Sequence, residues 1–527
     1  MTDLSAEQLV GNNGQSVRVG MTTFATQGLS WTGLVIAAVL LLPIFLKNGM
    51  TTLPEFFEKR YDATIRRAVS VIMLLSFILI MLPTILYAGA QVFVNIFPID
   101  EIFGISYFAA IAIVCVSISI IGSIYAIFGG LKAIAVSDTL NGAGMIIGGL
   151  IVPVCGLVFL STQLGGDGGL MDGLDKFLHT DPAMMNAWSE AGANEPWWPW
   201  PVLFTGLVVN NVYFWGCNQS IIQRALGAKS LAHAQKGMIL AGLIDLFTPI
   251  FLVVPGTICA LAYPGTDWGN GDTAFPTLIA EVMPTWLLGF MAAVIFGAIL
   301  SSYNSVLNSA STLYALDIHR PVFNPTASDE YVVKIGQRFG TIITIIATAI
   351  SPFLLYMGGI TTFLNAALGI FNTPVLVILL CGIFWKKTPT IAAKIVIPLH
   401  IILYVLLNYV LRDAIPVLQN IHYLYYTLAL FILDIIIMYI VTKVAPRETD
   451  FVHSSADAVV DLKPWKYRKV MIGVIVAITA AFYIVFSPWW LGKSDQTTWE
   501  RYQQSQASET ASVSSVTLQQ DGFAANE

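Results

Sequence analysis

Long apolar segments recur along the chain, and they restrict its possible folds more than any other feature. A helix of 18 or more apolar residues is long enough to cross a hydrocarbon layer of about 30 Å. Such runs are too long and too uniformly apolar for the alternating strands of an outer-membrane barrel. The sequence therefore predicts an all-α fold class, a polytopic membrane helical bundle. The predicted spans are residues 22–47, 68–95, 104–128, 133–162, 201–223, 234–264, 284–316, 333–357, 360–386, 390–412, 421–443 and 469–490.

The composition excludes most soluble classes of protein. Of 527 residues, 56% are hydrophobic and 11% are charged, whereas an average soluble domain has about 25% charged residues. The net charge of −6 provides no basic surface for nucleic acid. The five cysteines lie in apolar runs without C-x-x-C spacing, which favours buried thiols over disulfides or metal ligands. No catalytic triad, P-loop or metal-binding histidine cluster is evident, so we expect neither enzymatic activity nor a cofactor.

Basic residues concentrate in every second loop. The first loop holds Lys59, Arg60, Arg66 and Arg67, whereas the second, near residues 100–101, holds no Lys or Arg. The positive-inside rule places the basic loops in the cytoplasm. We therefore expect a multi-pass protein of the plasma (inner) membrane, with residues 491–527 as a disordered polar tail outside the cytoplasm. The same alternation continues at Lys132, Arg224, Lys229, Lys236, Arg320, Lys386, Lys387, Lys394, Lys463, Lys466, Arg468 and Lys469.

Two polar segments, residues 3–8 and 210–219, interrupt the apolar pattern. Discontinuous membrane helices expose carbonyl groups and helix ends at the midplane, where ions and polar solutes are held. The two segments begin two halves of five helices each, which predicts an inverted repeat. Residues 1–12 are either the outer half of an incomplete helix or a short external cap helix. The alternative for the polar side chains is hydrogen bonding between neighbouring helices.

A run of small residues with two adjacent hydroxyls, GAILSSYN at 297–304, suits a cation site because Na⁺ prefers oxygen ligands. Close helix packing is the alternative explanation. Asp138, Asp245 and Asp434 lie in or near apolar runs, where an ionised carboxylate costs about 2.5–3.5 kcal/mol. An ion pair accounts for Asp138, and Asp434 lies outside the two halves and is interpreted as structural. Asp245 requires a partner, a proton or a cavity.

Several longer strings resemble the solute:sodium symporter family, the relatives of the sodium/glucose cotransporters, and most strongly a bacterial branch of it. The resemblance implies a leucine-transporter-like fold, a 5+5 inverted repeat with additional C-terminal helices, that works by alternating access. It implies a transport core at 1–386 with an incomplete first helix, additional helices at 387–490 and the tail at 491–527. In relatives a half-helix and a whole helix precede LSAEQ, so Met1 is interpreted as an internal methionine or a truncation point. The matching strings are LSAEQLVG (4–11), LPIFLKNGMTTLPEFFEKRYD (42–62), GGLKAIAVSD (129–138), YFWGCNQSIIQRALGAKS (213–230), GAILSSYNSVLNSASTLYALDI (297–318) and IFWKK (383–387).

The resemblance also implies ligands for sodium, and part of a sugar site. A family acid beside the sodium exit route corresponds to Asp138. The galactose pattern is kept at some positions and changed at others, and a site left with unpaired polar groups rejects an analogue strongly. We therefore do not infer from the resemblance that galactose is the solute. The sodium ligands fall on Met1, Leu4, Ala298, Ser301 and Ser302. Sugar positions are kept at Gln8, Ser30, Asn211 and Trp215, whereas Gln27 replaces a glutamate, Asp245 a lysine, Phe214 a tyrosine, and Ala366 (beside Asn365) a glutamine.

The function expected from these observations is sodium-coupled symport of a small polar organic solute, a sugar or a polyol. Two alternatives remain: a cationic or zwitterionic solute paired with Asp245, or a non-transporting membrane sensor of the same fold. The expected partners are the solute, Na⁺ as coupling ion and the lipid bilayer, with no nucleic acid and no obligatory protein partner. The expected solute ligands are Gln8, Gln27, Ser30, Asn211, Phe214, Trp215 and Asp245.

Overall fold

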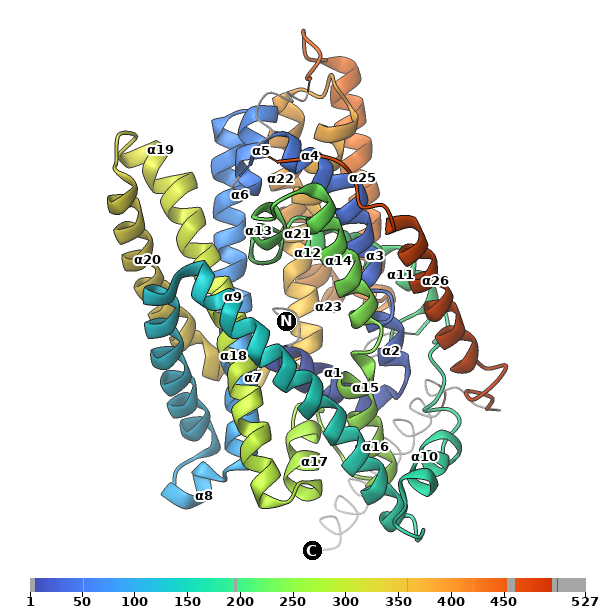
Figure 1. The fold of residues 1–527 in the computed structure, drawn as a ribbon. Coiled ribbons are helices and arrows are strands. Elements are labelled where there is room, and N and C mark those ends of the chain that lie inside the picture. The colour runs from blue at the N-terminus through green and yellow to red at the C-terminus, as the bar shows by residue number, and fades with distance from the viewer. Residues whose placement is uncertain are drawn as a thin grey trace, which may run out of the picture.

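The computed structural model describes residues 5–50, 52–193, 197–357, 359–419, 421–452, 460–494 and 500. Within these ranges the side chains of 125–138, 362 and 413 are not described. The described chain is a bundle of helices without a β-strand (Figure 1). The all-α prediction is therefore confirmed.

The first half of the bundle contains several helices with local changes of geometry. A π-helical turn interrupts two of the long helices, and each interruption is followed within two residues by a proline, Pro43 or Pro83. Proline lacks the N–H that regular α-helical bonding needs. The elements are α1 (Ala6–Val19), α2 (Thr22–Gln27), α3 (Trp31–Ile36), a π-helix (Ala37–Leu41), α4 (Leu42–Lys47), α5 (Leu53–Arg60), α6 (Ala63–Ser76), a π-helix (Phe77–Met81), α7 (Leu82–Ile96), α8 (Ile99–Phe103) and α9 (Tyr107–Gln163).

The second half and the helices that follow it complete the bundle. Figure 1 shows α9 running diagonally across α18 in the lower part of the bundle, and these two helices share an extensive contact. The elements are α10 (Leu170–His179), α11 (Trp200–Leu203), α12 (Gly206–Gly216), α13 (Gln219–Leu226), α14 (Leu231–Asp245), α15 (Pro249–Leu252), α16 (Val254–Ala262), α17 (Ala274–Val282), α18 (Thr285–Leu313), a π-helix (Tyr314–His319), α19 (Arg320–Phe323), α20 (Asp329–Ile350), a 3₁₀ helix (Ser351–Tyr356), α21 (Ile360–Phe384), α22 (Thr390–Val405), a π-helix (Leu406–Leu411), α23 (Arg412–Ala414), α24 (Pro416–Gln419), α25 (Tyr423–Val444) and α26 (Arg468–Val485).

Ten segments of the described chain are long and apolar enough to cross a membrane, or eleven if one bent pair counts as a span. The sequence predicts twelve. The predicted span 234–264 is the bent pair, with an angle of 44° between Leu231–Asp245 and Pro249–Ala262. The predicted span 201–223 is divided between α11, α12 and α13. Both differences are breaks within predicted spans, since the other ten predicted spans each overlap a qualifying segment.

The polar segment 210–219 is a true helix break. Helix α12 ends at Gly216, and α13 begins at Gln219. The Asn218 side chain caps α13 by accepting a hydrogen bond from the Ser220 N–H at 3.0 Å, which satisfies a donor that the helix leaves open. The first polar segment is described only from Ser5 onward, and α1 begins at Ala6.

Two arginines, the buried Arg60 and the half-buried Arg66, fasten the end of the bundle that carries α5. Arg60 is fully buried and donates to the carbonyl oxygens of Gly382 (2.7 Å), Thr388 (3.1 Å) and Trp385 (2.8 Å) at the end of α21. Arg66 pairs with the buried Asp317, Nε to Oδ1 at 2.8 Å. We call Arg60, Arg66 and Asp317 the α5 clasp. It holds α5 and α6 to the ends of α21 and α18.

Candidate solute and ion site

A polar cavity of about 90 Å³ lies among α1, α2, α12 and α21. Seven carboxamides, three hydroxyls and one carboxylate line it, and no Lys, Arg or His is among the described lining residues. We call it the solute cavity. Its polar lining consists of Gln8, Asn12, Gln27, Asn210, Asn211, Asn365 and Asn372, then Thr26, Ser30 and Thr361, then Glu7; its apolar lining consists of Trp198, Leu207, Phe214, Leu364 and Leu368.

Hydrogen bonds hold some of these amides in place. Gln8 Oε1 accepts from Asn12 Nδ2 at 2.6 Å and from Gln27 Nε2 at 3.3 Å. Asn211 Nδ2 donates to the Leu29 carbonyl oxygen at 3.2 Å. The amide groups of α1, α2 and α12 are thus oriented around one space by bonds to one another and to the backbone.

Other amides of the cavity keep unused hydrogen-bonding capacity. Asn210 Oδ1 and Asn372 Oδ1 are buried and have no hydrogen-bond partner among the residues that the structure describes. Buried polar atoms are nearly always paired, so such atoms require an explanation. Because both residues line the solute cavity, a polar ligand in that cavity would satisfy them.

Aromatic side chains form part of the cavity wall. Phe214 lies two residues before the end of α12, close to the helix break, with its ring 5.2 Å from that of Trp215 at 85°. Trp198 comes from the segment before α11, and its ring lies 5.3 Å from that of His422. Trp215 Nε1 donates to Ser30 Oγ at 2.9 Å and so fixes one of the lining hydroxyls.

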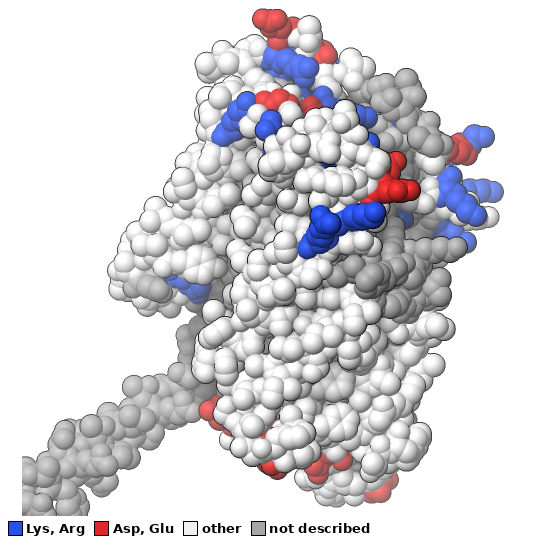
Figure 2. Space-filling model, turned by 90° about the vertical axis from the view of Figure 1, so that its left-hand side faces the viewer, with Lys and Arg blue, Asp and Glu red and all other residues white. Residues whose placement is uncertain are grey.

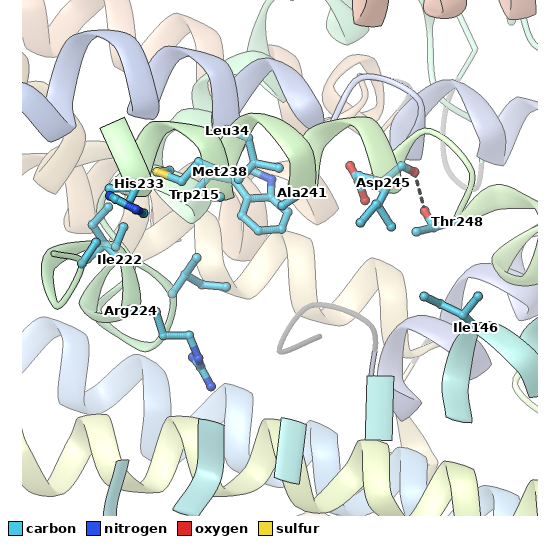
Figure 3. A pocket seen from close by; sticks show the side chains of 16 residues that line it. Leu34, Ile146, Trp215, Ile222, Arg224, His233, Met238, Ala241, Asp245 and Thr248 are labelled. Atoms are coloured by element: carbon cyan, nitrogen blue, oxygen red, sulfur yellow. Dashed lines mark hydrogen bonds between the residues drawn. The ribbon is translucent and has the colours of Figure 1, made fainter. Parts of the chain in front are cut away.

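A separate, larger and mainly apolar cavity of about 410 Å³ lies among α3, α9, α13 and α14 (Figure 3). Figure 3 shows His233, Met238, Ala241 and Asp245 along α14, facing this space. Asp245 ends α14, and its carbonyl oxygen accepts from Thr248 Oγ1 at 2.7 Å where the span bends. We call this space the α14 cavity.

The structure distributes the predicted solute ligands between the two cavities. Five line the solute cavity, whereas Trp215 and Asp245 line the α14 cavity. The carboxylate that faces the solute cavity is that of Glu7. The five that line the solute cavity are Gln8, Gln27, Ser30, Asn211 and Phe214.

The predicted sodium ligands of α18 share one side of the helix. Ala298, Ser301 and Ser302 are buried, and their spacing of three and four residues places them on the same face. Hydroxyl oxygens there fit a hard cation. Ser302 also lines a cavity of about 30 Å³ together with Glu7. Met1, Leu4 and the Asp138 side chain lie outside the described residues.

Sequence reasoning missed several residues of the solute cavity. Asn210 lies within the polar segment that the sequence singles out, and Asn365 is adjacent to Ala366, the position of the family glutamine. Asn372, next to Thr373 and Pro374, is a polar interruption of a long apolar run, which was an available signal. No pattern distinguishes the remaining ones, because inward and outward faces depend on how the helices pack. The missed polar residues are Glu7, Asn12, Thr26, Asn210, Thr361, Asn365 and Asn372.

Comparison with known proteins identifies the family. The sodium:solute symporter family model matches residues 1–394. The chain belongs to this family. It is 36% identical over 484 residues to the uncharacterized symporter YidK of Escherichia coli, covering 92% of this chain and 82% of that protein. It is 30% identical over 413 residues to the sodium/glucose cotransporter of Vibrio parahaemolyticus, covering 75% of this chain and 73% of that protein.

The fold of this symporter is also found in a solved structure of a Na⁺-coupled sialic acid symporter in a substrate-bound, outward-open state. The TM-score is 0.69 at 20% identity, over 86% of this chain and 89% of the other. The symporter therefore has the leucine-transporter-like fold that the resemblance implied. It is a multi-pass membrane protein and a secondary transporter coupled to Na⁺, not an enzyme.

Proposed function

We propose that the protein imports a small neutral polyhydroxylated solute, a sugar or a polyol, together with Na⁺ across the inner membrane. The observation that carries this proposal is the lining of the solute cavity. Carboxamides and hydroxyls donate and accept hydrogen bonds in the same way as sugar hydroxyls, and no described Lys, Arg or His is present to bind an acidic solute.

In this proposal the aromatic wall of the cavity has a specific role, which Phe214 performs. A flat ring beneath a sugar contacts its apolar face, while the surrounding amides bind the hydroxyls. Phe214 lies near the break between α12 and α13, where a small change in backbone direction would move the ring. In this proposal Phe214 is the inner gate.

Sodium supplies the driving force. In this proposal Na⁺ binds between α1 and α18, at Ser301 and Ser302 with backbone carbonyls of the first helix, and stabilises the outward-open state. A membrane potential contributes about 2.3 kcal/mol per charge per 100 mV, and a tenfold Na⁺ gradient adds about 1.4 kcal/mol. One Na⁺ per solute would therefore sustain accumulation of roughly 500-fold.

The proposed orientation puts the α5 end of the bundle in the cytoplasm and the C-terminal tail outside. Figure 2 shows Lys and Arg gathered toward the upper end, together with some Asp and Glu, whereas the lower end of this face carries Asp and Glu but no Lys or Arg. The basic loop between the first two long spans, with α5, lies at the upper end in Figure 1, and α8 with Asp100 and Glu101 lies at the lower end. This distribution agrees with the positive-inside rule.

The experiment is uptake by the full chain in proteoliposomes with an imposed inward Na⁺ gradient. The panel compares neutral sugars and polyols with a uronic acid and an amino sugar of similar size. The expected result is accumulation of a neutral member that a sodium ionophore abolishes. Preference for the uronic acid would contradict the solute class, and binding without accumulation would favour a sensor.

A further inference from the structure

Glu7 is an acidic residue to which the function above gives no role, and two cavities meet at it. It lines the solute cavity, and it also lines the small cavity of about 30 Å³ that contains Ser302 of α18. Gln8, Phe214 and Leu368 line both cavities as well. Glu7 therefore stands at the boundary between the solute cavity and a predicted sodium ligand.

The small cavity has the dimensions and the oxygen atoms that a single cation requires. A volume of 30 Å³ accommodates about one or two water-sized particles. Its oxygen-bearing side chains are those of Glu7, Gln8, Ser220 and Ser302, and most of the remaining lining is apolar. Hard cations prefer such oxygen ligands, and the apolar surroundings strengthen the attraction between a cation and a carboxylate.

The charge of Glu7 is the second argument. Glu7 is 9% exposed, and no Lys, Arg or His lines either cavity among the residues described. Ionisable groups inside a membrane bundle are costly and mark ion pathways. Glu7 also lies in the first turn of α1, at the positive end of the helix dipole. A cation in the small cavity would thus meet the carboxylate of Glu7 with no Lys, Arg or His among the described lining residues.

We propose that Glu7 provides the negative charge of the sodium site and couples that site to the solute cavity. Its carboxylate and Ser302 Oγ hold the coupling cation in the small cavity. When the cation is bound, the carboxylate is drawn toward it, and the amides of the other cavity are left to bind a neutral solute. Coupling of this kind is reciprocal, so bound solute raises the affinity for Na⁺ by the same factor. The inference rests on the proposed function because it assigns a ligand to the symporter's ion.

The test is binding of radiolabelled Na⁺ to the purified full chain without solute, with K⁺ as competitor. Glu7→Gln is expected to weaken Na⁺ binding at least about tenfold, which corresponds to about 1.4 kcal/mol. Glu7→Asp keeps the charge and is expected to retain more of the binding. The control is Glu101→Gln, the same change at an exposed acid of α8, which should bind Na⁺ like the unmodified protein.

Three outcomes would overturn the inference, and they differ in what they leave standing. Unchanged Na⁺ affinity in Glu7→Gln would overturn it while the proposed symport stands, and loss of solute binding alone would make Glu7 a solute ligand instead. No Na⁺ binding by the unmodified protein would remove both proposals. If Glu7→Gln does not fold, Glu7→Asp and Ser302→Ala are combined in a double-mutant cycle. Additive effects on Na⁺ affinity would then contradict a shared cation, since ligands of one ion couple.

Discussion

The Arg60 guanidinium of the α5 clasp and two amides of the solute cavity, Asn210 and Asn372, are all buried and polar, but their hydrogen bonding differs. In the clasp, each nitrogen of the Arg60 guanidinium donates to its own backbone carbonyl, at 2.7–3.1 Å. In the cavity, Asn210 Oδ1 and Asn372 Oδ1 have no hydrogen-bond partner within the described part of the chain. The clasp also uses full charges, whereas the cavity uses mainly neutral amides.

The difference distinguishes buried polar groups that stabilise the fold from buried polar groups that are available to bind a ligand. A buried polar group without a partner costs about 1–3 kcal/mol, and a ligand in the adjoining cavity would offset that cost for Asn210 and Asn372. Residues of the clasp should therefore determine stability. Residues of the solute cavity should determine transport and leave stability almost unchanged. The α14 cavity is larger but mainly apolar, so size alone does not identify the solute site.

The largest expected effect is on stability, from Arg60→Met. It removes three charge-assisted hydrogen bonds and leaves three carbonyls buried, so we expect a loss of about 3 kcal/mol or more in the free energy of unfolding. Denaturation of the purified protein in mixed detergents measures this. Arg67→Met, the same change at an exposed arginine bonded to the Ala63 carbonyl, is the control. Equal effects of the two changes would contradict the role of the clasp.

The next largest effect is on uptake, from Gln8→Ala. The change removes the acceptor shared by Asn12 and Gln27, and we expect uptake to fall about 100-fold at low solute concentration with little change in melting temperature. Gln91→Ala is the matched opposite case. Gln91 is a buried amide that bonds Tyr87 and Tyr107 on α7 and α9. The Gln91→Ala change should lower the melting temperature, and it should reduce uptake much less than Gln8→Ala does.

The third prediction concerns the pH dependence of stability, which the buried carboxyl group of Asp272 should influence. Burial raises the pKa of Asp272 to about 7, although the Ile360 N–H and the charge of Arg18 oppose the shift. Between about pH 4 and pH 7 the folded protein holds a proton that the unfolded chain has lost, so stability falls as pH rises through this range. Asp272→Asn should show a smaller fall in melting temperature between pH 5 and pH 8. An identical fall in both proteins would contradict the shift.

The smallest expected effect is that of Asp245→Asn. Because Asp245 lines the α14 cavity and not the solute cavity, we expect uptake of a neutral solute to change by less than about threefold. Initial rates in proteoliposomes measure it beside Gln8→Ala. A loss as large as that of Gln8→Ala would favour a cationic or zwitterionic solute paired with Asp245.

Much of the fold could be predicted from the sequence. The apolar runs gave the helical class and located the spans, and the polar segment 210–219 located the break before α13. The lining of the solute cavity could be predicted in part, because five of its residues were among the predicted ligands, whose role in binding stays a prediction. Asn12, Thr26 and Thr361 could not, since a polar residue in a membrane helix faces either a cavity or another helix.

The sequence by itself determined the helical bundle, the charge difference between its ends and the family, because length, hydropathy and motifs are local properties. Tertiary structure alone decided that Asp245 and Trp215 line a different cavity from Gln8, and that Glu7 borders both the solute cavity and Ser302. The physical reason is that a site in a bundle is built by side chains from α1, α2, α12 and α21. Their common orientation depends on helix packing and on the position of each break, which no single segment encodes.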